Sequence, residues 1–577
     1  MIQIQEEIKK LIAQTLTDLN FSAIDFNVLP SSDLAHGDYA TNVALILAKQ
    51  TGQTAKEIAE QIVEQVLKTK DSSLGPLKVR PCPWLGKIEV AGVGFINFYL
   101  ADNFLVENLR EILKLSDDYG HGNLYAGRKV MIEYTDPNPF KEFHIGHLMS
   151  NTIGETISRL IEFQGAEVKR ACYQGDVGLH VAKAIYGSLK LKAQNLKEIK
   201  EWGEAYVIGA EAYETDEQMK AEINEINKKV YAKSDAKINE LYNAGRKLSL
   251  EYFETIYQRL GTKFDFYFFE SETGEFGRKL VEENVDKIFE SSNGAIVFHA
   301  EKYDPKLHTR VFITKENLPT YEAKELGLAK IKFDRYPYDE SVVVTGNEVN
   351  AYFDVLLQAL KLIYPDLAPR TKHLGHGMLR LPTGKMSSRA GGVITAEDLL
   401  MEIKNDVERK MSGRNFSTST REAVMEAVAV AAIKYSILRQ VPGHDVIFNP
   451  KQSISFEGDS GPYLQYALVR ARAVLEKARV ARIQPGFESE VDPPGALEHQ
   501  LIHFSEIAVR ATREFAPNLL VGYLTELSST FNSYYALTPI AESGNPQAPY
   551  RVALTSAVVV VLQNGLRLLG LPSPTEM

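Results

Sequence analysis

The sequence is poor in cysteine, with only Cys82 and Cys172 among 577 residues. Two thiols cannot build a disulfide framework or a cysteine-rich zinc site, so a reducing, intracellular setting fits best. The first residues, MIQIQEEIKKLIAQTL, alternate charged and apolar side chains and lack the apolar stretch of a secretory signal. The longest aliphatic run near the end, AVVVVL, is too short to span a bilayer. We therefore expect a cytoplasmic protein with no membrane partner.

Basic residues are also fewer than acidic ones: the sequence has 65 Lys and Arg and 75 Asp and Glu, which gives a net charge of −10. Such a balance argues against a protein that coats nucleic acid indiscriminately, although it is compatible with a local basic surface. We find no internal repeat and no low-complexity tract. With 44% hydrophobic residues, the chain has the composition of a globular protein and the length for several domains.

Hydrophobic patterns divide the chain into three expected domains. Residues 1–122 combine helical patterns with an alternating strand, as in a small α+β domain. In residues 123–405 strand-like runs alternate with helical patterns, which predicts a Rossmann-like, doubly wound parallel sheet. A stretch at about 190–290 is rich in Lys, Glu and Ala at helical spacing, so it predicts a helical insertion. Residues 406–577 predict an all-α bundle, and the fold class is multidomain α/β. The strand-like runs of the second domain are KVMIEYT, EVKRACY, AIVFHA, TRVFIT and ESVVVTG.

The motif HIGH, from His144 to His147, follows the run KVMIEYT and precedes a helical pattern. In a doubly wound fold, a loop that leads from a strand into a helix N-terminus favours an anion, because the first-turn amides and the helix dipole both point at it. Imidazoles can donate hydrogen bonds to phosphate oxygens, and Gly146 leaves room for a flat base. The motif therefore indicates a nucleotide clamp. Taken alone, it could equally be two surface histidines at a turn; a metal pair is less favoured, since no third ligand is suitably spaced.

A second motif, KMSS, lies downstream on a loop that follows a Pro-Thr-Gly turn and begins at Lys385. A lysine on a mobile loop suits neutralisation of a leaving pyrophosphate. Alone, the motif is weak. In this order on an α/β chain, HIGH and KMSS together resemble the signature of class I aminoacyl-tRNA synthetases.

Longer matches resemble the arginyl-tRNA synthetase family. Upstream, Asp136-Pro137-Asn138 and Lys141 precede HIGH, and GDVG follows at residues 175–178. The stretch FEGDSGPYLQYALVRARAVLEKA is similar to the opening helix of that family's anticodon-binding domain, and HGDYATNVALILAK is similar to its N-terminal tRNA-binding domain. The resemblance covers nearly the whole chain. It implies an enzyme that activates L-arginine with ATP and transfers it to the 3′ end of tRNA(Arg).

The resemblance also implies an ATP site. Its residues would be His144, Gly146, His147, Met378, Lys385, Met386 and Ser387, with Gly146 and the backbone near Met378 beside the adenine. The catalytic groups would be His144, His147, Lys385 and Lys141. Ser388 stands where the class usually has a second lysine in the loop, and Lys141 would supply that charge, unless it is an ordinary surface lysine.

An arginine pocket must satisfy a planar, permanently charged guanidinium, for which carboxylates and a phenol are natural partners. The resemblance places this role on Glu133, Tyr321 and Glu325. Asn138 would hold the α-amino or carboxylate group of arginine, and Glu348 would contact its amino group or the ribose of ATP. Tyr321 and Glu325 are one helical turn apart and so share a face, though a solvated helix face would show the same spacing. Glu325 replaces the family's Asp, which leaves the depth of the pocket open.

The candidate tRNA-binding residues are Arg470, Arg472, Arg479 and Arg482, which lie around one basic helical pattern. We expect ATP with Mg²⁺ as the substrate complex, with no zinc and no organic cofactor. The expected partners are tRNA(Arg), L-arginine and ATP, and we expect a monomer. A nucleotidylyltransferase with the same clamp, or a catalytically silent paralogue that binds tRNA, are the alternative functions.

Overall fold

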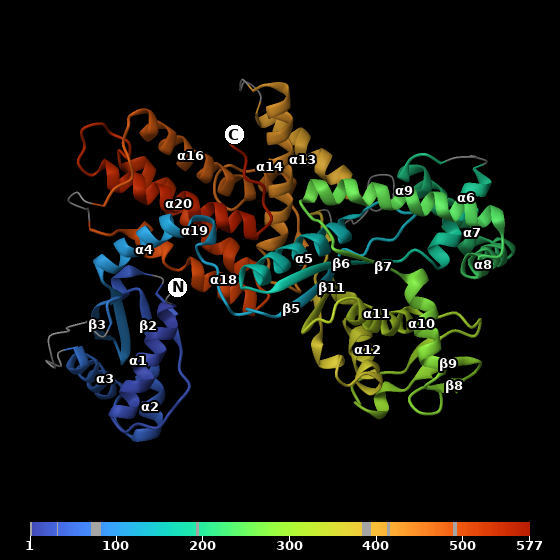
Figure 1. The fold of residues 1–577 in the computed structure, drawn as a ribbon, viewed down its shortest axis with the longest axis horizontal. Coiled ribbons are helices and arrows are strands. Elements are labelled where there is room, and N and C mark those ends of the chain that lie inside the picture. The colour runs from blue at the N-terminus through green and yellow to red at the C-terminus, as the bar shows by residue number, and fades with distance from the viewer. Residues whose placement is uncertain are drawn as a thin grey trace.

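A computed structural model describes residues 3–31, 33–70, 82–191, 196–382, 394–411, 416–487 and 493–577. The N-terminal part is a four-stranded antiparallel sheet in the order β1-β2-β4-β3, and α1 to α3 accompany it (Figure 1). Its own apolar core includes Ile8, Ile62 and Phe98. The elements are α1 (Ile4–Asp18), β1 (Val28–Pro30), β2 (Tyr39–Thr41), α2 (Val43–Thr51), α3 (Ala55–Lys70), β3 (Leu85–Ala91), β4 (Phe95–Leu100) and α4 (Asp102–Leu115).

A five-stranded parallel sheet forms the centre of the molecule, in the order β12-β11-β5-β6-β7. The chain starts in the middle at β5, adds β6 and β7 on one side, and returns to add β11 and β12 on the other. The strand order therefore reverses between β5 and β11, where ligands bind at the carboxyl ends of the strands in folds of this kind. The strands are β5 (Lys129–Tyr134), β6 (Glu167–Gln174), β7 (Phe266–Phe269), β11 (Glu340–Gly346) and β12 (Thr371–His376).

Both faces of this sheet are covered, as a parallel sheet requires. Side chains alternate along each strand, so Val130 and Ile132 enter one apolar core while Met131 enters another. The first core is shared with α5 (Ile145–Phe163) and the C-terminal helices. The second is shared with α10 (Glu270–Glu282), α11 (Tyr321–Arg335) and α12 (Asn350–Ile363). The expected Rossmann-like sheet is thus present.

The helical insertion lies between β6 and β7 and packs as a separate group of helices (Figure 1). It spans 179–260 rather than about 190–290, because the later residues include strand β7 of the central sheet. The runs AIVFHA and TRVFIT were expected in the parallel sheet. Instead they contribute β9 and β10 to a separate antiparallel sheet in the order β10-β9-β8. The elements are α6 (Leu179–Lys190), α7 (Ile199–Thr215), α8 (Glu217–Ala232), α9 (Ala236–Leu260), β8 (Glu290–Ser292), β9 (Ala295–Phe298) and β10 (Arg310–Ile313).

The C-terminal part is helical, as expected. Helix α20 (Ala548–Leu568) is long and apolar enough to cross a membrane, but 67% of that apolar window is buried inside the protein. It packs against α16 and α4, which accounts for its apolar sequence. The remaining elements are β13 (Leu379–Arg380), α13 (Ala396–Lys410), α14 (Thr418–Leu438), β14 (Val446–Ile447), α15 (Pro450–Ser453), α16 (Gly461–Val480), α17 (Ala496–Leu501), α18 (Phe504–Arg513) and α19 (Pro517–Leu537). Short 3-10 turns are η1 (Leu34–His36), η2 (Ser116–Asp118), η3 (Ala300–Lys302), η4 (Asn347–Val349) and η5 (Ala368–Arg370).

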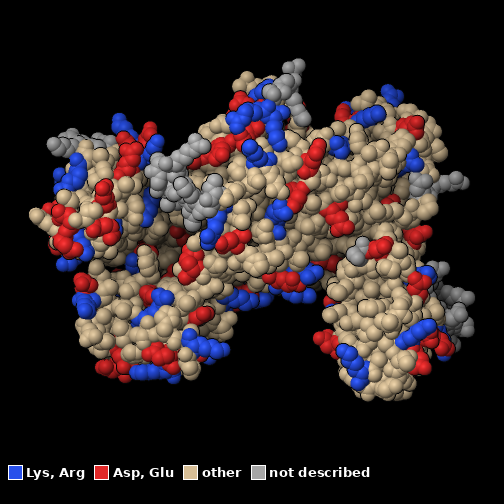
Figure 2. Space-filling model, turned by 180° about the vertical axis from the view of Figure 1, so that it is seen from behind, with Lys and Arg blue, Asp and Glu red and all other residues tan. Residues whose placement is uncertain are grey.

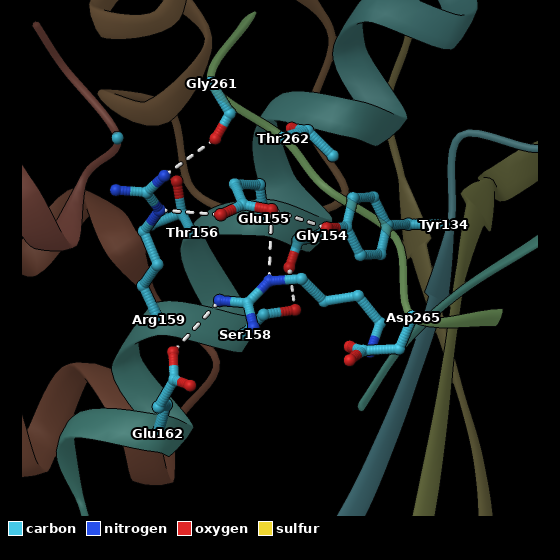
Figure 3. Close-up of polar contacts among 12 residues, drawn as sticks. Tyr134, Gly154, Glu155, Thr156, Ser158, Arg159, Glu162, Gly261, Thr262 and Asp265 are labelled. Atoms are coloured by element: carbon cyan, nitrogen blue, oxygen red, sulfur yellow. Dashed lines mark hydrogen bonds and ion pairs between the residues drawn. The ribbon is translucent and has the colours of Figure 1, made fainter. Parts of the chain in front are cut away.

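Helix α5 lies between the central sheet and the C-terminal helices and is buried almost throughout. Gly154 permits its close approach to β5, since a Cβ there would lie 2.3 Å from the Tyr134 ring. One turn of α5 carries a buried ion network (Figure 3). Glu155 accepts hydrogen bonds from the Tyr134 hydroxyl at 2.5 Å, from Arg159 Nε at 2.7 Å and from Arg170 Nε at 3.3 Å. This network ties β5 and β6 to the helix.

The same network reaches the insertion and the C-terminal helices. Arg159 donates to the carbonyls of Gly261, which follows α9, and of Arg567 on α20, each at 2.9 Å. The buried Lys434 side chain, on α14, donates to the neighbouring carbonyls of Leu260 and Gly570 at 2.6 and 3.0 Å, and burial lowers the pKa of its amine to about 7. Arg159 and Lys434 both donate where the helix dipoles of α9 and α20 are negative. The central sheet with α5, the helical insertion and the C-terminal helices are therefore joined at this point.

We expect the Glu155→Gln substitution to lower the free energy of unfolding by about 3 kcal/mol, because it leaves two partly buried guanidinium groups without their shared carboxylate. The measurement is the urea dependence of unfolding, followed by circular dichroism. Glu162→Gln is the matched control, since Glu162 also binds Arg170 but its side chain is 52% exposed. The control should cost at most about 1 kcal/mol. Equal losses for the two variants would contradict the role assigned to Glu155.

Candidate active site

The two histidines of HIGH cap the N-terminus of α5 and do so reciprocally. His144 is the N-cap residue, and its Nδ1 accepts a hydrogen bond from the Gly146 amide at 3.1 Å. The His144 amide in turn donates to His147 Nδ1 at 3.3 Å. The two rings stack with their centroids 3.5 Å apart. Because each Nδ1 is an acceptor, each ring carries its proton on Nε2.

Both rings are electrically neutral near pH 7. Burial lowers the pKa of His144 to about 4, and the nearby Lys141 ammonium acts in the same direction. Burial lowers the pKa of His147 well below its usual value, with further contributions from His144 and Lys141. The pair can thus present two Nε2–H donors at the positive end of a helix dipole without carrying charge. This arrangement suits an anionic ligand that must also be released.

The segment before α13 is held against this motif. An antiparallel bridge joins His144 and Thr395, the Ile145 amide donates to the Ile394 carbonyl at 3.2 Å, and the Ala396 amide donates to the Phe143 carbonyl at 2.7 Å. The predicted residues Lys385, Met386 and Ser387 lie outside the described residues. Their motif is nevertheless followed, a few residues later, by a segment anchored beside the histidines.

The loop between β5 and α5 has an unusual backbone. Thr135, Asp136 and Phe140 have φ values of 83°, 45° and 69°, in the left-handed region that non-glycine residues rarely adopt. Such strain is concentrated at functional sites. The loop brings Asn138 against Gly175, where an added Cβ would lie 2.5 Å from Asn138 Oδ1. Lys141 Nζ lies 4.1 Å from the centre of the Tyr206 ring on α7, so the insertion borders the site.

Buried carboxylates gather at the carboxyl edge of the sheet. Glu133 on β5 is 1% exposed and forms a 2.7 Å ion pair with Lys332 of α11. Burial and the Glu133 charge raise the pKa of Asp136 well above its usual range. Burial, and to a smaller extent the Glu133 charge, also raises the pKa of Glu325. Since carboxylates repel one another here, the site favours a cationic ligand.

Tyr321 is less enclosed than its proposed role suggests. It is the first residue of α11, and 60% of it is exposed, whereas Glu325 one turn later faces the carboxylates. Lys324 lies between them in sequence, and its ammonium is 5.1 Å from the centre of the Tyr321 ring. Because they are four residues apart, Tyr321 and Glu325 share a side of α11, but only Glu325 lies near Glu133 and Asp136.

Glu270 was missed from the sequence. It is buried at the start of α10, directly after β7, and pairs with Lys324 at 2.5 Å. Its Oε1 lies 3.3 Å from the position of a Cβ at Gly175, beside Asn138. The available signal was a glutamate directly after a strand of the parallel sheet, FYFFE, but those residues had been assigned to the helical insertion.

The remaining predicted residues lie at the ends of β11 and β12. The Glu348 carboxylate folds back over Gly346, 2.2 Å from where a Cβ would be. Met378 uses its amide for Asp445 and its carbonyl for the Val446 amide, each at 2.8 Å. The Met378 backbone, which was expected beside an adenine, thus binds Asp445 and Val446, and its contact with a nucleotide stays a prediction. Among the described residues, no group of three or more His, Cys, Asp or Glu is arranged to hold a metal ion.

Comparison with known proteins agrees with this geometry. The family described as tRNA synthetases class I (R), catalytic domain, matches residues 108–449. The arginyl tRNA synthetase N terminal domain matches residues 4–100, and the DALR anticodon binding domain matches residues 464–577. The chain belongs to the class I arginyl-tRNA synthetase family. The resemblance drawn from the sequence is thus confirmed, as is the multidomain α/β fold class.

Relatives and a solved structure extend over the whole chain. Arginine–tRNA ligases of Treponema denticola and Fusobacterium nucleatum are each 29% identical to it, covering 98% of this chain and 98% and 100% of their own. The Thermus thermophilus arginyl-tRNA synthetase structure has a TM-score of 0.80 at 23% identity, with 100% of each chain covered. As a member of this arginyl-tRNA synthetase family, the chain is an aminoacyl-tRNA ligase whose substrates are arginine, ATP and tRNA.

The four arginines proposed to bind tRNA in this synthetase do not form one surface. Arg470 lies between the rings of Tyr466 and Tyr535 and donates to Asn532 at 2.5 Å. Arg472 is half-buried and donates to the Pro574 carbonyl and to Gln563, at 3.2 and 2.9 Å. These bonds tie Arg472 to the end of the chain, and its contact with tRNA stays a prediction.

Arg479 and Arg482 are exposed at the end of α16. On the face of the synthetase seen in Figure 2, basic and acidic side chains alternate. A polyanion would therefore meet local groups of cations on that face and not a uniform basic surface.

The neutral histidines generate a pH prediction for this synthetase. An unfolded histidine has a pKa of about 6.5, so protons bind the unfolded chain preferentially below that pH. The stability contributed by His144 should be complete above pH 6.5 and decline as the pH falls toward 4. Two-bond ¹H–¹⁵N spectra of the imidazoles should show the Nε2–H tautomer for both rings, unchanged between pH 8 and about 5. A ring of His144 or His147 that titrates near pH 6.5 would contradict this assignment.

Proposed function

We propose that this enzyme forms arginyl-adenylate at the carboxyl edge of its parallel sheet, with His144 and His147 as neutral donors to the ATP phosphates. The observation that carries the proposal is the reciprocal cap, which leaves both Nε2–H groups available at a helix N-terminus. Gly146, Met378 and the KMSS residues Lys385, Met386 and Ser387 complete the ATP site. Mg²⁺ would arrive with ATP and be held largely by its phosphates.

In the first step, an arginine carboxylate oxygen attacks the α-phosphorus of ATP. A new P–O bond forms as the bond to the bridging oxygen breaks, and pyrophosphate leaves with the electron pair. No enzyme nucleophile is needed, so positioning and charge stabilisation supply the rate. Lys385 and Lys141 would offset the charge on the leaving pyrophosphate. In the second step, a hydroxyl of the terminal ribose of tRNA(Arg) attacks the activated carbonyl, and AMP leaves.

Arginine would lie among the carboxylates that the fold gathers. Glu325 and Glu133 would receive its cationic groups, Asn138 and Glu348 its backbone, and Tyr321 would close the pocket from the exposed side. We add Glu270, because it is buried beside Asn138 at the same edge of the sheet. We further propose that the enzyme is a cytoplasmic monomer, and that residues 1–122, 123–405 and 406–577 serve tRNA binding, catalysis and anticodon binding.

The decisive test is arginine-dependent exchange of pyrophosphate into ATP, measured with each standard amino acid, with and without tRNA. Arginine alone should support exchange. His147→Ala and Lys385→Ala should lower the exchange rate by about 10- to 1,000-fold, the range for one lost transition-state contact, with little change in the arginine KM. Near-normal rates in both variants would overturn the ATP site, and exchange with another amino acid would overturn the substrate.

Glu325→Gln should raise the KM for arginine by at least about tenfold and leave the KM for ATP nearly unchanged, because it removes a charge that pairs with the substrate and not with the nucleotide. The matched control is Asp334→Asn on the same helix, whose carboxylate pairs with Lys330 in solvent. An equal rise in both KM values would mean that Glu325 shapes the whole site instead of reading arginine.

Replacing Arg479 and Arg482 with alanine should weaken tRNA binding and reduce the slope of log Kd against log salt by up to about two units, since each lost phosphate contact releases about one counterion fewer. Unfolding should be unaffected, because both side chains are exposed. Arg472→Ala is the contrasting variant, and it should destabilise the C-terminal helices. An unchanged salt slope in the double variant would place the tRNA elsewhere.

A further inference from the structure

Two lysines of α11 are buried at the carboxyl edge of the sheet, and each is paired with one carboxylate. Lys324 binds Glu270, and Lys332 binds Glu133 with a side chain that is only 3% exposed. Taking both members of an ion pair out of water costs several kcal/mol per ion, which their attraction seldom more than offsets. Stability alone is therefore a weak reason for either pair, and a role in the site is the better explanation.

Lys332 differs from Lys324 in the number of carboxylates that it faces. Glu133 comes from β5, Asp136 from the loop after it, and Glu325 from α11 itself, two turns before the lysine. Tyr338 completes its surroundings, and the Glu270–Lys324 pair on α10 and α11 lies beyond Glu325. Although burial opposes it, the Glu133 charge raises the pKa of Lys332 above the ordinary lysine value. One permanent cation therefore lies among three acids.

With all three acids ionised, this group has three negative charges and one positive charge, so its net charge is −2. Arginine brings two positive groups, the guanidinium and the α-ammonium, and one carboxylate, so its net charge of +1 would bring the charge of the group to −1. Without the lysine, the same acids would hold a charge of −3 in a buried place. Buried carboxylates in that situation take up protons. A protonated acid no longer requires a cation as its partner.

We propose that Lys332 is a specificity-determining positioning residue: it fixes Glu133 through one oxygen, and its charge favours the ionised form of Glu325 and Asp136, so that the pocket accepts arginine and rejects its neutral analogue citrulline. This inference rests on the proposed function. Lys332 need not touch the substrate, because it acts through Glu133 and Glu325.

The test uses Lys332→Gln, which keeps a hydrogen-bond donor for Glu133 but removes the charge. At pH 7 the arginine KM in pyrophosphate exchange should rise about 10- to 100-fold, because the acids are harder to ionise without the lysine charge, while the ATP KM changes little. The KM should fall again as the pH rises toward 9, because the acids then ionise. The ratio of citrulline Ki to arginine KM should decrease, and Lys332→Arg should restore parental values.

Lys330→Gln is the matched control, since its ammonium pairs with Asp334 at the surface of the same helix and should leave every constant unchanged. An arginine KM for Lys332→Gln that equals the parent's, or that rises equally at every pH, would overturn the proposal. Failure of both Lys332→Gln and Lys332→Arg to fold would also overturn it, since the lysine would then be a structural residue. A parent without arginine-dependent exchange would instead overturn the proposed function.

Discussion

The burial of α5 between the sheet and the C-terminal helices is the constraint on which the rest of the structure depends. The helix contributes to the largest apolar core, and its residues Glu155 and Arg159 bind β5, β6, the residue that follows α9, and α20. Because the helix is fixed on every side, its N-terminus is fixed as well. The histidines at that end are therefore held where the strand order of the sheet reverses.

A fixed helix end also determines the electrostatic character of the nucleotide site. The cap uses the Nδ1 atoms of His144 and His147, and burial keeps both rings neutral. Positive charge comes instead from lysines on neighbouring loops and from the helix dipole. Because the positive charge lies on other groups, the two histidines can donate to the phosphates without a change of protonation during the reaction.

On the amino acid side of the site, buried acidic groups outnumber buried basic groups. Carboxylates from β5, its following loop and α11 converge, while two lysines of α11 neutralise only part of their charge. Burial makes each unpaired carboxylate costly, so the shortage of cations gives the site a strong preference for a cationic substrate. The same helix thus supplies both the acids and their partial neutralisation.

The sequence by itself determined the class of the fold and of the enzyme. Alternating strand and helix patterns predicted the parallel sheet, and HIGH with KMSS indicated the family, because these motifs are local and their spacing survives in the folded chain. The sequence did not reveal that AIVFHA and TRVFIT form a separate sheet, since short apolar strands have the same pattern in either. Strand β7 was missed for a similar reason, and Glu270 with it.

Only the tertiary structure decided which charged residues face one another. Lys332 and Glu133 are about 200 positions apart in the chain and meet because the fold brings the end of α11 beside the end of β5. Arg472 looked like a surface cation, but the end of the chain returns to cover it and accepts its hydrogen bonds. Helical periodicity shows which face of a helix a residue occupies. What covers that face is set by long-range packing, which no local pattern records.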